Sequence, residues 1–310
     1  MKIGNIELKN NLILAPMAGI TDFAFRSLAV TYGADYGVTE MVSAKALKYK
    51  SKKTYDLLVT APNETIKVVQ IFGSDPKIMA KAVASKELEK FDIIDINMGC
   101  PAPKIVKNGE GSALMANMEL AKNIISECVK ATNKPITVKF RIGINGDNNA
   151  CAFAQMCEQS GASAITIHGR TREQYYSGKC DLEVIKQVKQ SVSIPVIANG
   201  DVTNRETFLN ILKVTGCDAV MVGRASLGHP EVFAEILNKK IEVNKLGQIK
   251  QHINMLLTYY PEIFVVKHMR KHILWYLKGE RNCSNVKAEV CKLTKISDVI
   301  KVLENFYNNK

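Results

Sequence analysis

Short apolar segments alternate with amphipathic ones along the first 225 residues of this 310-residue chain. Eight of the apolar segments have the length and residue types of buried β-strands. They cover residues 12–15, 36–39, 67–72, 91–97, 136–140, 164–168, 195–199 and 219–222. Most neighbouring segments are separated by a stretch in which apolar residues recur with helical spacing. Alternating strands and helices predict a parallel sheet, and eight such units predict a closed (β/α)8 TIM barrel.

Helix-capping signals support the expected helices. Asp75 followed by Pro76 predicts an N-cap and a proline at the first helical position. Thr203 and Glu206 have the spacing of a capping box. Gly33 and Gly161 follow two expected helices, at positions where a left-handed residue is favoured.

The alternation stops after Pro230. From there to the end of the chain only helical spacing is found, and we expect helices over residues 253–260, 265–277 and 299–306. We therefore expect a catalytic barrel over residues 1–238 and a small C-terminal all-helical domain over residues 245–310, with a linker near 238–247.

The net charge of +12 is unevenly distributed. From Lys239 to the end, fourteen Lys and Arg residues face six Asp and Glu residues, a net charge of +8, which leaves +4 for the first 238 residues. A basic helical segment on a nearly balanced body favours a polyanion such as nucleic acid as partner. A solvated basic surface is the alternative.

Composition also bears on the compartment and on metals. No apolar run approaches the roughly 20 residues of a membrane span, and the N-terminus lacks a signal-peptide layout. The eight cysteines form no CxxC pair, which argues against a disulfide framework and against a cysteine metal site. We expect a cytoplasmic monomer with reduced thiols, without a membrane partner and without a bound metal.

The most informative stretch is DINMGCP, residues 95–101. An apolar strand ends at Asn97, and the thiol of Cys100 follows between a glycine that permits a turn and a proline that prevents the strand from continuing. The pattern favours a reactive group at the mouth of a barrel, and a buried structural cysteine is the alternative. The interval between strand ends is longest here, at 43 residues, which predicts a functional loop after Cys100.

Polar residues and glycines gather at the ends of the other strands as well. The carboxyl ends of barrel strands meet at one rim, where barrel enzymes have their active sites. The set comprises Pro16, Met17, Ala18, Gln70, Asn97, Cys100, Lys139, His168, Arg170, Asn199, Gly200, Asp201, Gly223 and Arg224.

The last two strands indicate the kind of ligand. Loops after strands 7 and 8 of a barrel often hold a phosphate, and Gly200, Gly223 and Arg224 suit that task. Neither GxGxxG after the first strand nor a P-loop is present, so FMN is favoured over a dinucleotide. Lys139 would then stabilise the reduced flavin ring. A Schiff-base lysine and a salt-bridged lysine are the alternatives for Lys139.

Nine segments in the same order resemble the tRNA-dihydrouridine synthase family, nearest to its bacterial B type. They are APMAGITDFAFR (15–26), VQIFGSDP (69–76), DINMGCPAPK (95–104), GSALM (111–115), ITVKFRIG (136–143), ITIHGRTREQYYSG (165–178), IPVIANGD (194–201), VMVGRASLG (220–228) and, more weakly, VKHMRKHILWYL (266–277). Residues 103–109 and the tail beyond Glu280 depart from the B type.

The resemblance implies reduction of the C5=C6 bond of D-loop uridines in tRNA, with FMN as cofactor and NADPH or NADH as reductant. It implies a hydride from flavin N5 to C6, a proton from Cys100 to C5, and Asn97 and Arg170 near the uracil. An ordinary thiol, with a pKa of about 8.5, suits an acid role. The implied FMN contacts are Pro16, Met17, Ala18, Gln70, Lys139, His168, Asn199, Gly200, Asp201, Gly223 and Arg224.

The basic helical domain would then hold the folded tRNA by its phosphates. Lys267, Arg270 and Lys271 lie within one and a half turns of an expected helix, so we expect their charged heads to form one strip. Leu274 and Trp275 are expected to pack that helix against its neighbours. The alternative function is a small-molecule FMN oxidoreductase of the dihydroorotate or enoate type, which would not need a basic helical domain.

Overall fold

Eight parallel strands close into a barrel in the computed structural model, which describes residues 1–144, 146 and 149–308. Each strand pairs with the next in the sequence, and the last pairs with the first. The strands are β3 (Leu12–Leu14), β4 (Tyr36–Ser43), β5 (Val68–Phe72), β6 (Ile93–Met98), β7 (Ile136–Arg141), β8 (Ala164–His168), β9 (Val196–Asn199) and β10 (Ala219–Val222). The predicted TIM barrel is confirmed, with strand ends shifted by at most four residues.

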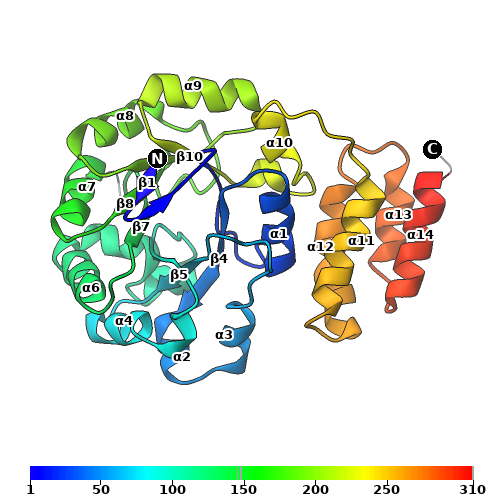
Figure 1. The fold of residues 1–310 in the computed structure, drawn as a ribbon, viewed down its shortest axis with the longest axis horizontal. Helices are drawn as coiled ribbons and strands as arrows, with labels where there is room; N and C mark the ends of the chain where they lie inside the picture. The colour runs from blue at the N-terminus through cyan, green and yellow to red at the C-terminus, as the bar shows by residue number, and fades with distance from the viewer. Residues whose placement is uncertain (145, 147–148, 309–310) are drawn as a thin grey trace.

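Helices surround the barrel (Figure 1). They are α1 (Phe23–Thr31), α2 (Ala44–Lys48), α3 (Lys52–Asp56), α4 (Pro76–Val83), α5 (Pro103–Lys107), α6 (Met118–Lys130), α7 (Ala150–Gln159), α8 (Leu182–Ser191), α9 (Arg205–Thr215) and α10 (Val232–Ile236), with the 3-10 turns η1 (Lys86–Leu88), η2 (Gly111–Ala116) and η3 (Arg224–Ser226). Both α5 and η2 lie in the long segment after Cys100, so the predicted loop is folded into two short helical pieces.

One predicted helix N-cap is confirmed, and another is wrong by one residue. Asp75 caps α4 by accepting a hydrogen bond from the backbone N–H of Ile78 at 3.0 Å. At α9 the N-cap is Asn204, one residue after the predicted Thr203, and its side chain and that of Thr207 form the capping box. An asparagine amide is the stronger cap of the two, and it sets where the helix begins.

A short hairpin closes the amino end of the barrel. Strands β1 (Lys2–Ile3) and β2 (Ile6–Glu7) are antiparallel, and Gly4 turns between them with a φ of +58°. Ile3 and Leu8 pack against apolar side chains inside the barrel, such as Ile93 at the start of β6. The Gly4–Asn5 pair is a two-residue turn signal that our prediction missed.

Side chains inside the barrel change from apolar to polar along each strand. Successive inward positions lie two residues apart, because side chains alternate between the two faces of a strand. On β6 these positions are Ile93, Asp95 and Asn97, and on β7 they are Thr137 and Lys139. The apolar layer and the hairpin fill the amino end, so the polar groups collect at the carboxyl end.

Four C-terminal helices pack against one side of the barrel, and we call them the helical bundle. They are α11 (Lys245–Leu257), α12 (Glu262–Tyr276), α13 (Cys283–Val290) and α14 (Ile296–Asn308). Figure 1 shows α11 and α12 next to α1, with α13 and α14 outermost. Phe23 and Ala24 of α1 share a buried cluster with Ile253 and Met269 of the bundle, so the two regions have a common core.

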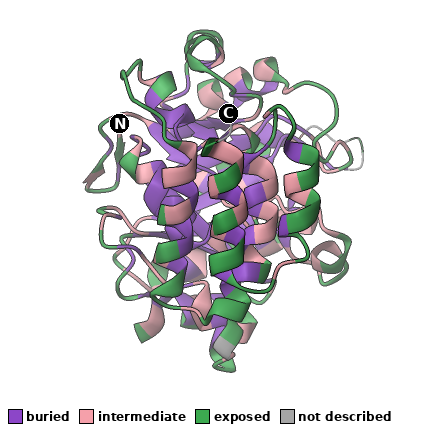
Figure 2. Cartoon of the chain, turned by 90° about the vertical axis from the view of Figure 1, so that its right-hand side faces the viewer, coloured by how far each residue is buried: buried purple, intermediate pink, exposed green. Residues whose placement is uncertain are grey.

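Two details of the helical prediction are wrong. Helix α11 begins at Lys245, so Gly247 lies in its first turn rather than in a linker. Helix α13 was not predicted because only Cys283 and Val290 of its residues are buried, which leaves little periodic signal. Buried residues line the inner sides of the bundle helices and exposed residues their outer sides (Figure 2). None of the helices in the described part of the chain has the length and the apolar run of a membrane span.

Candidate active site

A cavity of about 660 Å³ opens at the carboxyl end of the barrel. Its volume lies within the range of small-molecule and cofactor sites. The residues that we predicted for the site and that line this cavity are Pro16, Met17, Ala18, Gln70, Asn97, Cys100, Lys139, His168, Asn199, Gly200, Asp201, Gly223 and Arg224. Segments from all around the barrel therefore bring the predicted polar groups together.

The turn that carries Cys100 is held by Asn97. The side-chain oxygen of Asn97 accepts hydrogen bonds from the backbone N–H groups of Gly99, at 3.1 Å, and Cys100, at 2.9 Å. A Cβ on Gly99 would lie 3.2 Å from the Cα of Phe140, a crowded distance, so glycine lets the turn pass close to β7 without a shift of that strand. The position of the Cys100 thiol is thus set by its own backbone.

The side chain of Asn97 is in turn held by a series of buried hydrogen bonds. Its amide nitrogen donates to Gln70 Oε1 at 2.7 Å, and Gln70 donates to Asp95 Oδ2 at 2.7 Å. Thr137 donates to the other oxygen of Asp95 at 2.6 Å. Burial raises the pKa of the Asp95 carboxyl to about 6, although both hydrogen bonds and the charge of Lys139 oppose the rise. This network fixes the amide groups beneath the cavity.

Lys139 and Asn199 form the opposite side of the cavity floor. Lys139 Nζ donates to Asn199 Oδ1 at 2.9 Å, and the Asn199 amide nitrogen donates to the Met221 carbonyl at 2.9 Å. Burial lowers the pKa of Lys139 to about 8, with a further contribution from the Arg141 charge. The ammonium group stays mostly protonated at neutral pH and supplies a positive charge at the floor.

The lowered pKa of His168 reflects its burial and the positive charge around the cavity. Burial lowers its pKa to about 2, and the charges of Lys139, Arg141, Arg170 and Arg224 add to the effect. The imidazole is therefore neutral at physiological pH. Four cations near one neutral ring make this cavity a favourable place for an anionic ligand.

Arg170 does not reach the cavity, which differs from its expected place beside a uracil. Its side chain is 2 % exposed. Its Nη2 donates to both carboxylate oxygens of Asp201, at 2.7 and 2.8 Å, and its Nε donates to the Ser177 carbonyl at 3.0 Å. Arg170 thus holds the Asp201 carboxylate in place. Asp201 Oδ1 also forms an ion pair with Arg224 Nη2 at 3.3 Å.

Arg141 and Tyr176 are among the cavity-wall residues that we did not predict. Arg141 donates from Nε to the Gly99 carbonyl at 2.8 Å and from Nη1 to the carbonyls of Thr171 and Tyr175, each at 3.0 Å. Its place two residues after Lys139 on β7 was a signal for an inward side chain. Tyr176 stacks under Arg224, whose Cζ lies 5.1 Å from the ring centroid, and no sequence pattern marked it.

The helical bundle contributes to the rim of the cavity. Trp275 and Lys278, at the end of α12, line it together with the barrel residues. Gly228 makes this close approach possible, because a Cβ there would lie 2.2 Å from the Trp275 carbonyl carbon. Trp275 therefore faces the cavity, whereas we expected it to pack between helices.

The predicted basic strip on α12 is wrong, because its three side chains point in different directions. Arg270 Nη2 donates to the Leu293 carbonyl at 2.9 Å, inside the bundle. Lys271 is half-buried against the barrel, with its Nζ 3.3 Å from where a Cβ of Gly19 would lie. Lys267 is exposed, whereas Arg270 and Lys271 are partly buried.

A family model and individual relatives of known name place this chain in the same protein family. The model of the dihydrouridine synthase family matches residues 13–310. A tRNA-dihydrouridine synthase B from Vibrio cholerae is 39% identical over 100% of this chain and 99% of its own length. One from Shewanella oneidensis is 42% identical over 90% of each chain.

Among solved structures, a 2-naphthoyl-CoA reductase in complex with 2-naphthoyl-CoA is similar in fold. It superposes with a TM-score of 0.61 at 11% identity, covering 77% of this chain and 51% of the other. This likeness concerns the barrel architecture alone.

Proposed function

Since the chain belongs to the dihydrouridine synthase family, we propose that it reduces the C5=C6 bond of D-loop uridines in tRNA to 5,6-dihydrouridine. FMN is the proposed cofactor, and NADPH or NADH the reductant. The observation that carries the proposal is the cavity, in which a thiol, a buried lysine and two arginines meet at the carboxyl end of the barrel.

The residues in the cavity fit a flavin phosphate at the ends of β9 and β10. Gly200 has a φ of +134° and would clash with Cys180 if it had a Cβ, so its backbone follows a path that only glycine allows. Gly223 lies in the cavity wall, where a Cβ would come into van der Waals contact with Ala15 and Met17, and the next residue is Arg224, whose side chain is half-exposed. We infer that Gly200, Gly223 and Arg224 bind the phosphate, with Asp201 orienting Arg224.

The proposed ring site lies between the first strand and the cavity floor. Pro16, Met17 and Ala18 form one wall, and Gln70, Lys139, His168 and Asn199 supply polar groups. Reduced FMN would supply a hydride from its N5 atom to C6 of the uracil. The Lys139 ammonium, held by Asn199, would stabilise the negative charge of the reduced ring.

Cys100 is the proposed proton donor to C5. Its thiol would give up the proton as the new C–H bond forms and would regain it from solvent through the open cavity. Asn97 acts here as a positioning residue, because its amide already holds the Cys100 turn and Gln70. Arg141 takes the place that we had expected for Arg170, since it lies in the wall and is electrostatically coupled to Cys100. Its charge would polarise a uracil carbonyl.

The tRNA has to present one uracil outside its stack, as other base-modifying enzymes require. Trp275 and Lys278 place the helical bundle at the rim of the cavity, where the flanking backbone of such a nucleotide would pass. We infer that the bundle contacts tRNA through these residues and the exposed Lys267, without help from Arg270 or Lys271.

The direct test uses an unmodified tRNA transcript, the purified protein, FMN and NADPH. We expect dihydrouridine in the D-loop by nucleoside mass spectrometry, and no reduction of free uridine. Reduction of dihydroorotate-type or enoate substrates without any reaction on tRNA would replace the proposal by the small-molecule alternative.

A further inference from the structure

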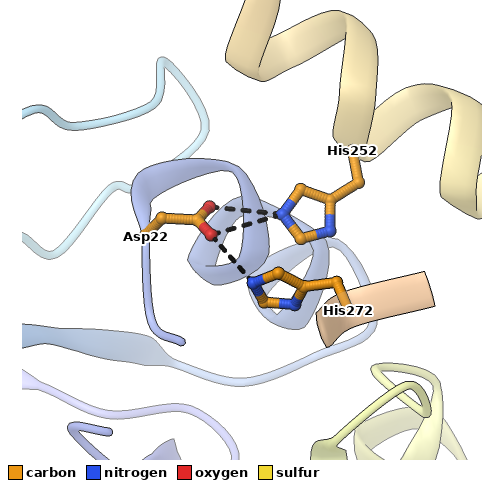
Figure 3. A group of neighbouring side chains, drawn as sticks. All are labelled: Asp22, His252 and His272. Atoms are coloured by element: carbon orange, nitrogen blue, oxygen red, sulfur yellow. Dashed lines mark hydrogen bonds and ion pairs between the residues drawn. The ribbon is translucent and has the colours of Figure 1, made fainter. Parts of the chain in front are cut away.

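A second cluster of titratable groups lies outside the cavity, where the helical bundle meets the barrel. Asp22 precedes α1, His252 lies on α11, and His268 and His272 lie on α12. Figure 3 shows the imidazoles of His252 and His272 directed at the carboxylate of Asp22. Three of the five histidines of the chain meet at this point.

The distances suit a shared ion. His252 Nε2 lies 3.3 Å from Asp22 Oδ1, and His272 Nε2 lies 3.4 Å from Asp22 Oδ2. One ligand atom from each of these residues falls within 4.8 Å of the other two. Ligand atoms around a tetrahedral zinc ion are separated by about 3.3 Å, given bonds of about 2.0–2.1 Å.

His272 lacks the partners that a buried imidazole needs. Its side chain is 0% exposed, its Nδ1 has no hydrogen-bond partner within the described residues, and its Nε2 has no hydrogen bond there beyond the 3.4 Å contact with the Asp22 carboxylate. A buried polar group without a partner is costly, and such groups are rare in native proteins. A metal ion bound at Nε2 would satisfy the nitrogen that faces Asp22.

Neighbouring groups orient the ligands. Asp22 Oδ1 accepts a hydrogen bond from the Phe25 backbone N–H at 2.9 Å, which fixes the carboxylate at the start of α1. His268 Nε2 contacts Asp22 Oδ2 at 2.9 Å, and the Tyr276 hydroxyl lies 3.5 Å from His252 Nδ1. Contacts of this kind, to the outer side of a ligand, are typical of metal sites.

We propose that Asp22, His252 and His272 bind one Zn²⁺ ion, which joins the helical bundle to the barrel. Two imidazoles and a carboxylate form a common ligand set for zinc, and a water molecule would complete the tetrahedron. The ligands come from the N-cap of α1 and from the helices α11 and α12, and about 230 residues separate Asp22 from His252 in the sequence.

The site also lies next to the cavity. The backbone N–H groups of Ile20 and Thr21 bond to the Met17 carbonyl, each at 3.0 Å, and Asp22 follows directly. Met17 lines the proposed flavin site. An ion on Asp22 would therefore anchor both the bundle and the base of this loop.

The cysteine spacing predicts no metal site, because cysteine pairs were the only signal considered. The histidines give a different signal, since His268 and His272 are four residues apart on one helix face. Without a metal, the same cluster would be a buried polar network between Asp22 and the three histidines.

The test measures metal in tag-free protein, since an affinity tag of histidines would bind metal itself. Protein stripped with dipicolinate and incubated with ZnSO4 should retain about one equivalent of zinc per chain after gel filtration. Zinc should raise the melting temperature by about 5 °C. Co²⁺ in place of zinc should give the visible absorption of a tetrahedral site. His272→Gln and His252→Gln should each lose the metal and the shift, whereas His229→Gln, a histidine on the barrel surface, should keep both.

The possible results separate the alternatives. Failure of the stripped wild-type protein to retain zinc or to give a cobalt spectrum would overturn the proposal, whatever the variants do. Retention of a full equivalent by a folded His272→Gln protein would place the metal elsewhere and also overturn it. Iron in place of zinc, in protein from medium containing both, would overturn the assignment of the ion.

Discussion

The barrel and the helical bundle both carry many polar side chains, but they arrange them differently. In the barrel, Asn97, Lys139, His168 and Asn199 come from four strands and meet in one cavity. In the bundle, Lys267, Arg270 and Lys271 are near neighbours in sequence and point to three different environments. A closed parallel sheet brings the ends of distant strands together, whereas nothing in a helix makes neighbouring side chains share a partner.

The difference suggests a division of tasks. The cavity would carry out the chemistry, and the bundle would hold tRNA at its rim. The predictions below test whether the two tasks can be separated.

The largest effect is expected for Cys100→Ala. Loss of a general acid typically costs about 10²–10⁴-fold in rate, so uridine reduction should fall by that factor. FMN binding and NADPH oxidation should stay unchanged, because the Asn97 hydrogen bonds to the turn involve backbone groups. Cys291→Ala, at an exposed cysteine, is the control for loss of a thiol. Loss of FMN together with activity would mean that Cys100 is structural.

A smaller effect is expected for Arg224→Ala. Charge-assisted hydrogen bonds contribute about 1.5–3 kcal/mol, so FMN should bind about 10–100-fold more weakly. Fluorescence titration of the apoprotein with FMN measures this. Lys213→Ala, at an exposed lysine of α9, should leave the affinity unchanged. Equal FMN affinities of the two variants would exclude Arg224 from the phosphate site.

How far the sequence could predict the molecule also differs between the two regions. Strand periodicity located all eight barrel strands, and the ends of those strands identified half of the residues that line the cavity. The same argument could have predicted Arg141, because it lies two residues beyond Lys139 on the same strand. It could not have predicted Tyr176, because the position of Tyr176 depends on the path of the loop after β8.

In the bundle, helical spacing predicts which helices form but not which side faces the barrel. The close approach at Gly228 turns Trp275 toward the cavity, and no local pattern encodes that contact. The direction of Arg270 depends on the Leu293 carbonyl, 23 residues away. Packing between distant segments therefore decides what the bundle presents to a ligand.

A still smaller effect per residue is expected for Lys267→Glu combined with Lys278→Glu. Each lost phosphate contact should weaken tRNA binding roughly fivefold and should reduce the slope of log K against log salt by about one. Filter binding at several salt concentrations measures both. Lys301→Glu, on the outer helix α14, is the matched control. Identical affinities and slopes for all three proteins would show that this face does not bind tRNA.

The smallest effect concerns the pH dependence of stability caused by His272, where the helical bundle meets the barrel. In metal-free protein, burial lowers the pKa of His272 from 6.5 to about 3, so the unfolded chain binds more protons between these values. Stability should therefore fall as the pH falls below about 6.5, and His272→Gln should weaken that fall.

His229 provides a control of opposite sign. Its hydrogen bond to Glu231 raises its pKa, so its contribution to stability is present below pH 6.5 and is lost as the pH rises through the folded-state value. His229→Gln should make acidification more damaging. Melting temperatures from pH 7 to pH 4.5 decide between these directions, and parallel curves for both variants would contradict them.

Single-turnover reduction of tRNA by the pre-reduced protein tests the division of tasks most directly. At saturating tRNA, Cys100→Ala should be at least about 100-fold slower than the wild-type protein. The Lys267→Glu, Lys278→Glu protein should match the wild-type rate at saturation and fall behind only at low tRNA concentrations. A wild-type rate for Cys100→Ala, or a reduced saturating rate for the double lysine variant, would contradict it.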